Sequence, residues 1–141
     1  MDYEARDIRA IIIIVLTILC FFEAYTYFTS YKSETLICDR EKNSCVVERI
    51  TRLNKVKTAY LMDVDEVKDV RVNSHYRRHR NWITGRMRRR SYYFLVFRHI
   101  NNRTERRIFS RRYRSDEQAK EKAHEIMMKL REDSNIIEVS R

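Results

Sequence analysis

The residues best suited to binding chemistry are arginines, and they are concentrated in one segment. Residues 75–114 contain fourteen arginines and a single acidic residue, Glu105. A guanidinium group presents a planar fork of N–H donors that binds phosphate or carboxylate oxygens in pairs and stacks on aromatic rings. Because interleaved acids are missing, we expect this segment to bind an anionic surface. The residues expected to contact it are Arg77, Arg78, Arg80, Trp82, Arg86, Arg88, Arg89, Arg90, Arg111 and Arg112.

Three classes of ligand fit such a surface, and the sequence leaves them open. The first expectation is an acidic face of a membrane protein subunit, because Arg and Trp are favoured anchors at protein interfaces. The second is anionic lipid headgroups, to which each nearby basic residue adds roughly 1 kcal/mol of attraction. Nucleic acid is the least expected, although Tyr76, Trp82, Tyr92 and Tyr93 are available to stack on bases. The remaining alternative is a solvated surface that binds nothing.

The other residues that carry chemistry give weaker signals. Cys38 and Cys45 enclose six residues, and in a hairpin centred between Glu41 and Lys42 they lie opposite each other, within reach of a disulfide. We expect a bridge in an oxidising compartment and free thiols in the cytosol. The histidines show no metal-ligand spacing near these cysteines, and no nucleophile motif or catalytic carboxylate pair stands out. We therefore expect no metal, no cofactor and no enzymatic activity.

An apolar run near the N-terminus decides the class of protein. It covers residues 10–28, in which only Thr17, Glu23 and Thr26 are polar. A helix of this length measures roughly 28 Å at ~1.5 Å per residue, about the thickness of the hydrocarbon core. We expect residues 1–31 to form a short tail and an uncleaved transmembrane anchor. The acidic start and the lack of a small-residue cleavage site disfavour a signal peptide. A buried core helix is disfavoured because the run has no polar face.

Two features of this anchor stay open. Glu23 lies either at the level of the headgroups or in polar contact with another membrane subunit. The basic residues that flank the segment number two before it and three after it, which does not fix its orientation. The expected location is therefore a membrane crossed once, with the side of the soluble domain undecided.

Residues 32–141 show the pattern of one basic soluble domain. Short β-rich segments separated by polar turns predict strands over residues 34–38, 45–51, 56–61, 67–73, 91–100 and 104–109. Residues 75–90 are expected to form a long loop, and residues 135–139 an extended tail. Ser115 is expected to cap a helix whose apolar positions recur along one face. These positions are Ala119, Ala123, Ile126, Met127 and Leu130. Six strands followed by one amphipathic helix predict an α+β roll, a curved antiparallel sheet with a helix over one opening.

Several short motifs carry a family resemblance. They are the membrane segment, the LICDR sequence of Leu36–Arg40, the second cysteine at Cys45, the turn from Leu61 to Val67 and the C-terminal helix. Together they cover about residues 8–132, and the chain resembles small bacterial membrane-anchored proteins whose soluble part is similar to a pleckstrin-homology (PH) domain. The resemblance implies a PH-like roll at the bacterial cytoplasmic membrane, in a group that mostly lacks an assigned activity. PH domains that bind inositol lipids do so in the first hairpin, where this chain is charge-balanced, so we do not expect that ligand.

These observations predict a non-enzymatic, single-pass membrane protein that acts as an accessory or scaffold subunit of a membrane protein complex. We expect it to dock through its transmembrane helix and its arginine-rich surface. A membrane-surface domain that binds anionic lipid is the alternative, and a membrane-tethered nucleic-acid-binding protein is less expected.

Overall fold

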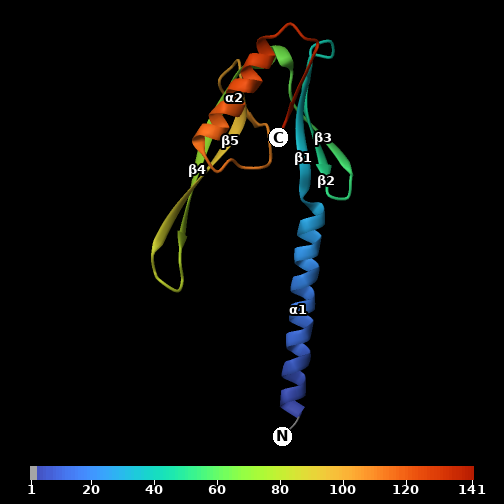
Figure 1. The fold of residues 1–141 in the computed structure, drawn as a ribbon, viewed down its shortest axis with the longest axis vertical. Helices are drawn as coiled ribbons and strands as arrows, with labels where there is room; N and C mark the ends of the chain where they lie inside the picture. The colour runs from blue at the N-terminus through green and yellow to red at the C-terminus, as the bar shows by residue number, and fades with distance from the viewer. Residues whose placement is uncertain (1–2) are drawn as a thin grey trace.

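A computed structural model describes residues 3–141 and has an α+β fold, with an N-terminal apolar helix, two antiparallel sheets and a C-terminal helix (Figure 1). The elements in chain order are α1 (Tyr3–Thr29), β1 (Tyr31–Asp39), β2 (Ser44–Thr51), β3 (Val56–Met62), the 3-10 turn η1 (Val64–Glu66), β4 (Val67–Arg80), β5 (Met87–His99), β6 (Glu105–Arg107), α2 (Asp116–Arg131) and β7 (Ile136–Ser140).

Helix α1 projects from the rest of the chain as a single rod (Figure 1). Its side chains from Ile8 to Thr29 are exposed on every side, with a mean hydropathy of 2.2 in its most apolar part. A helix that is apolar all round has no face suited to water. By length and composition it is therefore able to cross a membrane. Residues 1–2 of the predicted tail lie outside the described residues.

The first sheet has the strand order β3-β2-β1-β7. Its central hairpin pairs Cys38 directly with Cys45, the register expected from the sequence. The Asp39 carboxylate closes the turn by accepting hydrogen bonds from the backbone N–H groups of Glu41 and Lys42, at 3.0 and 3.2 Å. The predicted C-terminal tail is a strand, since β7 pairs antiparallel with β1 along the free edge of that hairpin.

The second sheet has the order β4-β5-β6, and helix α2 packs against β4 and β5 and also contacts β7. Helix α2 begins as predicted, because the Ser115 hydroxyl accepts a hydrogen bond from the Gln118 N–H at 3.2 Å. One core joins both sheets and the helix. Its largest fully buried side chains include Leu36, Leu95, Phe97, Ile108, Phe109, Ile126 and Ile137.

The structure corrects three predictions. The described residues form seven strands in two sheets, where the sequence predicted six strands in one curved sheet. Strand β6 ends at Arg107 and is shorter than the predicted 104–109 segment, and the Ile108 and Phe109 side chains that follow it are buried in the core. Residues 75–90 are not a loop, because β4 and β5 continue as a paired ribbon to Arg80 and Met87.

Candidate functional site

The arginine-rich segment forms a two-stranded ribbon that extends beyond the core. We call residues 74–91 the basic ribbon. It begins at Ser74, which pairs with Tyr93 on β5. Every β4 side chain from His75 to Arg80 is exposed. Six further residue steps at ~3.4 Å give a projection of about 20 Å. Figure 1 shows the ribbon leaving the same end of the domain as α1 and pointing in roughly the same direction. Its tip is level with the C-terminal half of that helix.

The turn at the tip explains why the segment folds back on itself. The Asn81 N–H donates to the Arg86 carbonyl at 3.0 Å, and the Gly85 N–H donates to the Asn81 carbonyl at 2.8 Å. The Asn81 side-chain oxygen also accepts from the Ile83 N–H at 3.0 Å. Gly85 is the chain's only glycine and has φ +65°, a conformation that favours glycine. Asn and Gly are residue types that turns favour, but this signal was not used and the sequence prediction here was a long loop.

The charge of the basic ribbon is unbalanced within the ribbon itself. It holds seven arginines and no acidic residue. The register places Arg77 opposite Arg90 and Arg78 opposite Arg89. Like charges in opposed positions destabilise a strand pair. No ion pair involving these seven arginines is found among the side chains that the structure describes, residues 8–141. The ribbon thus presents its guanidinium groups to the solvent without a partner carboxylate from the described part of the protein.

The two faces of the basic ribbon both carry arginines. One face has a shallow hollow of about 310 Å³, lined by Arg77, His79, Arg90 and Tyr92. The opposite face has a smaller hollow between Tyr76, Arg78 and Arg89. Aromatic side chains stand beside the guanidinium groups on each face, an arrangement suited to oxyanions beside an apolar surface. The ribbon is therefore able to contact a broad anionic surface rather than one small ligand.

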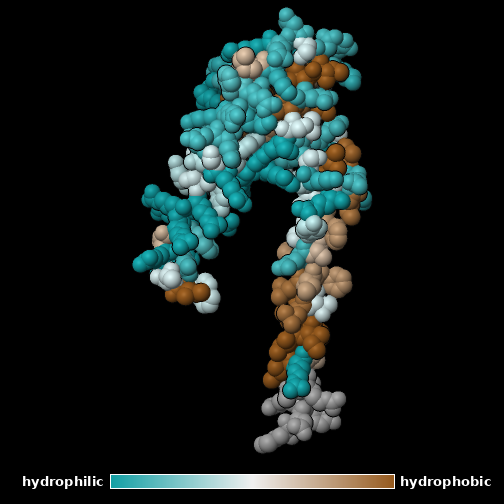
Figure 2. All heavy atoms as spheres, viewed as in Figure 1, coloured by the Kyte–Doolittle hydropathy of each residue, from teal (hydrophilic) through white to brown (hydrophobic). Residues whose placement is uncertain are grey.

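The tip of the ribbon is apolar. Trp82 is 90% exposed, Ile83 75% and Met87 62%. Figure 2 shows hydrophobic side chains at the end of an otherwise hydrophilic ribbon, apart from the apolar surface of α1. The sequence analysis identified Trp82 as a contact residue, but not the apolar tip to which it belongs.

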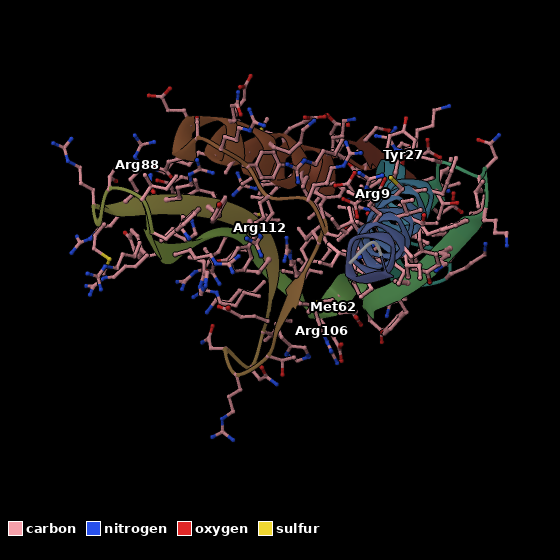
Figure 3. The ribbon with its side chains drawn as sticks, turned by 90° about the horizontal axis from the view of Figure 1, so that it is seen from below. Arg9, Tyr27, Met62, Arg88, Arg106 and Arg112 are labelled. Carbon is pink, nitrogen blue, oxygen red and sulfur yellow. A yellow bond between two sulfur atoms is a disulfide. The ribbon has the colours of Figure 1, made fainter. Side chains whose placement is uncertain are left out.

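Arg111 and Arg112 do not lie on the ribbon. They belong to the segment between β6 and α2, where the Arg111 guanidinium donates to the Tyr31 carbonyl at the start of β1. The Arg112 guanidinium lies 4.9 Å from the centre of the Tyr92 ring, at the base of the ribbon. In Figure 3 Arg112 lies between α1 and the far part of the ribbon that carries Arg88. Arg111 thus has a structural contact, and Arg112 extends the basic surface towards α1.

The junction between α1 and the domain fixes the direction of the helix. Only Ser30 separates α1 from β1. The Arg52 guanidinium lies over the Tyr27 ring at 3.8 Å, and its Nε donates to the Ser30 hydroxyl at 3.0 Å. The β2–β3 turn, which carries Arg52 and Lys55, lies close to the end of α1 in Figure 1. This second basic element was not predicted from the sequence, because its few charges are interrupted by Leu53 and Asn54.

A buried carboxylate holds the β6–α2 segment to β1. Glu34 is 1% exposed and accepts hydrogen bonds from Arg49 Nε at 3.0 Å, from the Ser110 N–H at 2.9 Å and from the Arg111 N–H at 3.1 Å. Burial acts to raise the pKa of Glu34, but the hydrogen bonds from Ser110, Arg111 and Arg49 outweigh it, so that the pKa lies below its usual value. A carboxylate with all its donors supplied by the protein is a structural group.

The remaining predicted site residues lie apart from the basic ribbon. Cys38 and Cys45 are fully buried in the first sheet and joined by a disulfide. Glu23 lies on α1, where its carbonyl accepts a hydrogen bond from the Thr26 hydroxyl at 2.9 Å. Among the side chains of residues 8–141, no group of three His, Cys, Asp or Glu is arranged to hold a metal ion.

Comparison with known proteins adds no relative. No protein-family model, curated protein or solved structure matches the chain. The resemblance to membrane-anchored proteins with a PH-like domain therefore stays a prediction, and the functional argument rests on the geometry described above.

Proposed function

We propose that this chain is a non-enzymatic, single-pass membrane protein whose basic ribbon binds the anionic headgroups of the bilayer that α1 crosses. In this proposal the domain between them is PH-like, with its two antiparallel sheets and the helix α2. The observation that carries this proposal is the direction of the ribbon. It leaves the same end of the domain as α1, and its tip is level with the C-terminal half of α1 (Figure 1). An acidic subunit elsewhere on the domain surface would not require this direction.

The helix has the dimensions of an anchor. The apolar part of α1, Ile8–Thr29, contains 22 residues. At ~1.5 Å per residue this is roughly 33 Å, compared with a hydrocarbon core of about 30 Å. Tyr25 and Tyr27 near its end are suited to the membrane interface. The contact between Tyr27 and Arg52 supports an anchor that stays with the domain, in preference to a signal peptide that is removed.

The arginines supply attraction of the required size. Each basic residue near an anionic surface contributes roughly 1 kcal/mol, so that seven arginines acting together exceed the thermal energy several-fold. The arginines Arg77 and Arg90 are opposed in the register, as are Arg78 and Arg89, and each pair repels in water. Phosphate oxygens bound between the two guanidinium groups of a pair reduce this repulsion. All seven side chains are exposed, so the attraction falls as salt screens it.

The disulfide supports a location of the domain on the oxidising side of the membrane. Bridges such as Cys38–Cys45 form and persist in oxidising compartments. We infer that the domain lies on the extracytoplasmic side of the membrane, which the family resemblance implies is the bacterial cytoplasmic membrane. On that side nucleic acid is not the expected ligand. An acidic face of a membrane subunit stays the second candidate, because Arg and Trp are favoured anchors in protein interfaces.

Hydrogen exchange on the full chain in nanodiscs tests the proposal. A two-stranded ribbon is marginally stable by itself, so the amides of residues 75–80 and 87–91 should exchange quickly in phosphatidylcholine. In phosphatidylglycerol they should exchange slowly, and high salt should abolish the difference. Equal exchange in the two lipids would contradict lipid binding. Slow exchange that appears only with a co-purified acidic subunit would replace it by the partner proposal.

A charge variant sharpens this test because its effect changes sign with the lipid. Replacing Arg78 and Arg89 together by Gln removes one opposed pair, so the ribbon amides should exchange more slowly than wild type in phosphatidylcholine. In phosphatidylglycerol the same variant should lose about 2 kcal/mol of attraction, or about 30-fold in protection. The matched control replaces Lys42 and Arg131, which lie outside the ribbon, by Gln. It should change the exchange of the ribbon amides in neither lipid.

A further inference from the structure

We propose that the tip of the basic ribbon, Trp82 and Ile83, enters the acyl region of the bilayer and forms a second membrane attachment of the domain. This inference rests on the proposed function, in which the ribbon faces the bilayer. It goes further because headgroup binding needs only the arginines, whereas insertion gives the apolar tip a role of its own.

The first argument is exposure. Trp82 and Ile83 are adjacent, 90% and 75% exposed, and no core residue lies near them in the chain. Met87, which is 62% exposed, follows at the start of β5. Scattered exposed apolar residues are ordinary, but large apolar side chains gathered at the end of a projecting hairpin mark an interaction surface. Figure 2 shows this apolar end against the hydrophilic shaft.

The second argument is the order of residue types along the ribbon. Arg80 at the end of β4 and Arg86 directly before β5 flank the tip, and the other ribbon arginines stand further towards the domain. If the tip points into the bilayer, the apolar side chains reach the acyl region first and the guanidinium groups stop at the phosphates. The long stems of arginine allow this by lying along apolar surface while the charged end stays in the headgroup layer. Tryptophan itself favours the interface between these layers.

The third argument concerns the backbone. A turn moves out of water at lower cost when its polar backbone groups are bonded within the protein. In this turn the N–H groups of Asn81, Ile83 and Gly85 donate to acceptors within the turn, whereas those of Trp82 and Thr84 have no partner among the described residues. The Asn81 side chain thus serves the tip as an internal acceptor, and the cost of moving the turn out of water is reduced.

The fourth argument is reach. The ribbon projects about 20 Å beyond the core at ~3.4 Å per residue. It leaves the same end of the domain as α1 and points in roughly the same direction, and its tip is level with the C-terminal half of that helix (Figure 1). The aromatic residues Tyr25, Tyr27 and Phe28, near the end of α1, mark the expected interface. A tip that lies beyond this level along the helix lies within the bilayer.

The chain provides its own probe, because Trp82 is the only tryptophan. We would measure its fluorescence in the full chain in phosphatidylglycerol nanodiscs, with and without brominated acyl chains, and its access to acrylamide. Insertion predicts emission at shorter wavelength than in detergent, quenching by the brominated chains and protection from acrylamide. Ile83→Ser should reduce the quenching. The matched control Ile100→Ser, an equally apolar exposed residue beyond the opposite end of β5, should not.

The outcomes separate the two proposals. If the ribbon amides are protected in phosphatidylglycerol but Trp82 stays open to acrylamide and is not quenched, insertion is overturned and headgroup binding stands. If the amides are not protected and Trp82 is not quenched, both are overturned. Because α1 holds the chain in the nanodisc in every case, the readout comes from the ribbon and not from loss of membrane association.

Discussion

Replacing Glu34 by Gln should destabilise the domain by about 3 kcal/mol, because the carboxylate accepts four hydrogen bonds in a buried site. Losing one partner of a buried ion pair costs about 3–5 kcal/mol, and the partner Arg49 is 21% exposed, so water lowers the cost to the bottom of that range. The Gln amide also directs N–H groups at backbone donors. At roughly 4 °C per kcal/mol for a domain of this size, the Tm should fall by about 12 °C.

Thermal unfolding of the full chain in detergent, followed by near-UV circular dichroism, measures this effect. The matched control is Glu48→Gln, a half-exposed glutamate on the neighbouring strand β2, which should change the free energy of unfolding by less than about 0.5 kcal/mol. The difference between wild type and Glu34→Gln also depends on pH. The pKa of Glu34 lies below its usual 4.5, so the stabilisation is complete above that value and is lost as the pH falls through the lowered pKa. Equal stability of wild type and Glu34→Gln would refute the reasoning. So would a difference in stability between them that grows as the pH falls.

Two further predictions concern the ribbon turn and the first hairpin. Gly85→Val should cost about 1–2 kcal/mol and speed exchange of the ribbon amides in neutral nanodiscs, because φ is +65° although an added Cβ meets nothing within 4 Å. Gly85→Asn should cost less, and equal effects would indicate that the conformation is not limiting. Replacing Cys38 and Cys45 together by Ala should lower the free energy of unfolding by roughly 2–3 kcal/mol, the value for a closed loop of this length. A reducing agent should lower the free energy of unfolding of wild type and leave that of the variant unchanged. A variant as stable as oxidised wild type would contradict a stabilising role of the bridge.

Much of the fold follows from local periodicity. The apolar run of α1, the strand-rich segments of the first sheet and the 3.6-residue pattern of α2 each specify one element without help from the others. The Cys38–Cys45 register also followed from the hairpin's centre. These elements are local, so the sequence contains their signals within short windows.

The basic ribbon was missed because its strands lack the usual signal. Residues 75–90 hold arginines in place of alternating apolar residues, and opposed like charges disfavour pairing. The ribbon continues a ladder that begins in the core, so its register is inherited from Val72 and Leu95, which are paired there. The partner of β7 was hidden for a different reason, because β1 lies about a hundred residues earlier in the chain.

Glu34 was missed although the sequence contained a signal for it. In the strand around LICDR, Glu34 has the same parity as Leu36 and Cys38, and alternation places all three on the buried face. A carboxylate at a core position requires internal donors. The sequence did not identify those donors, because Ser110 and Arg111 follow β6 and reach β1 only through the tertiary fold.

In the proposed function the basic ribbon faces the bilayer that α1 crosses. Paramagnetic relaxation from gadolinium-labelled headgroups, measured on the full chain in phosphatidylglycerol nanodiscs, tests this orientation. We expect strong broadening of the amide signals of residues 77–80 and 87–90 and of the β2–β3 turn. We expect none at residues 40–43, the β1–β2 turn at the end of the domain away from α1 (Figure 1). Sharp signals from the ribbon, with broadening confined to the β2–β3 turn, would contradict it.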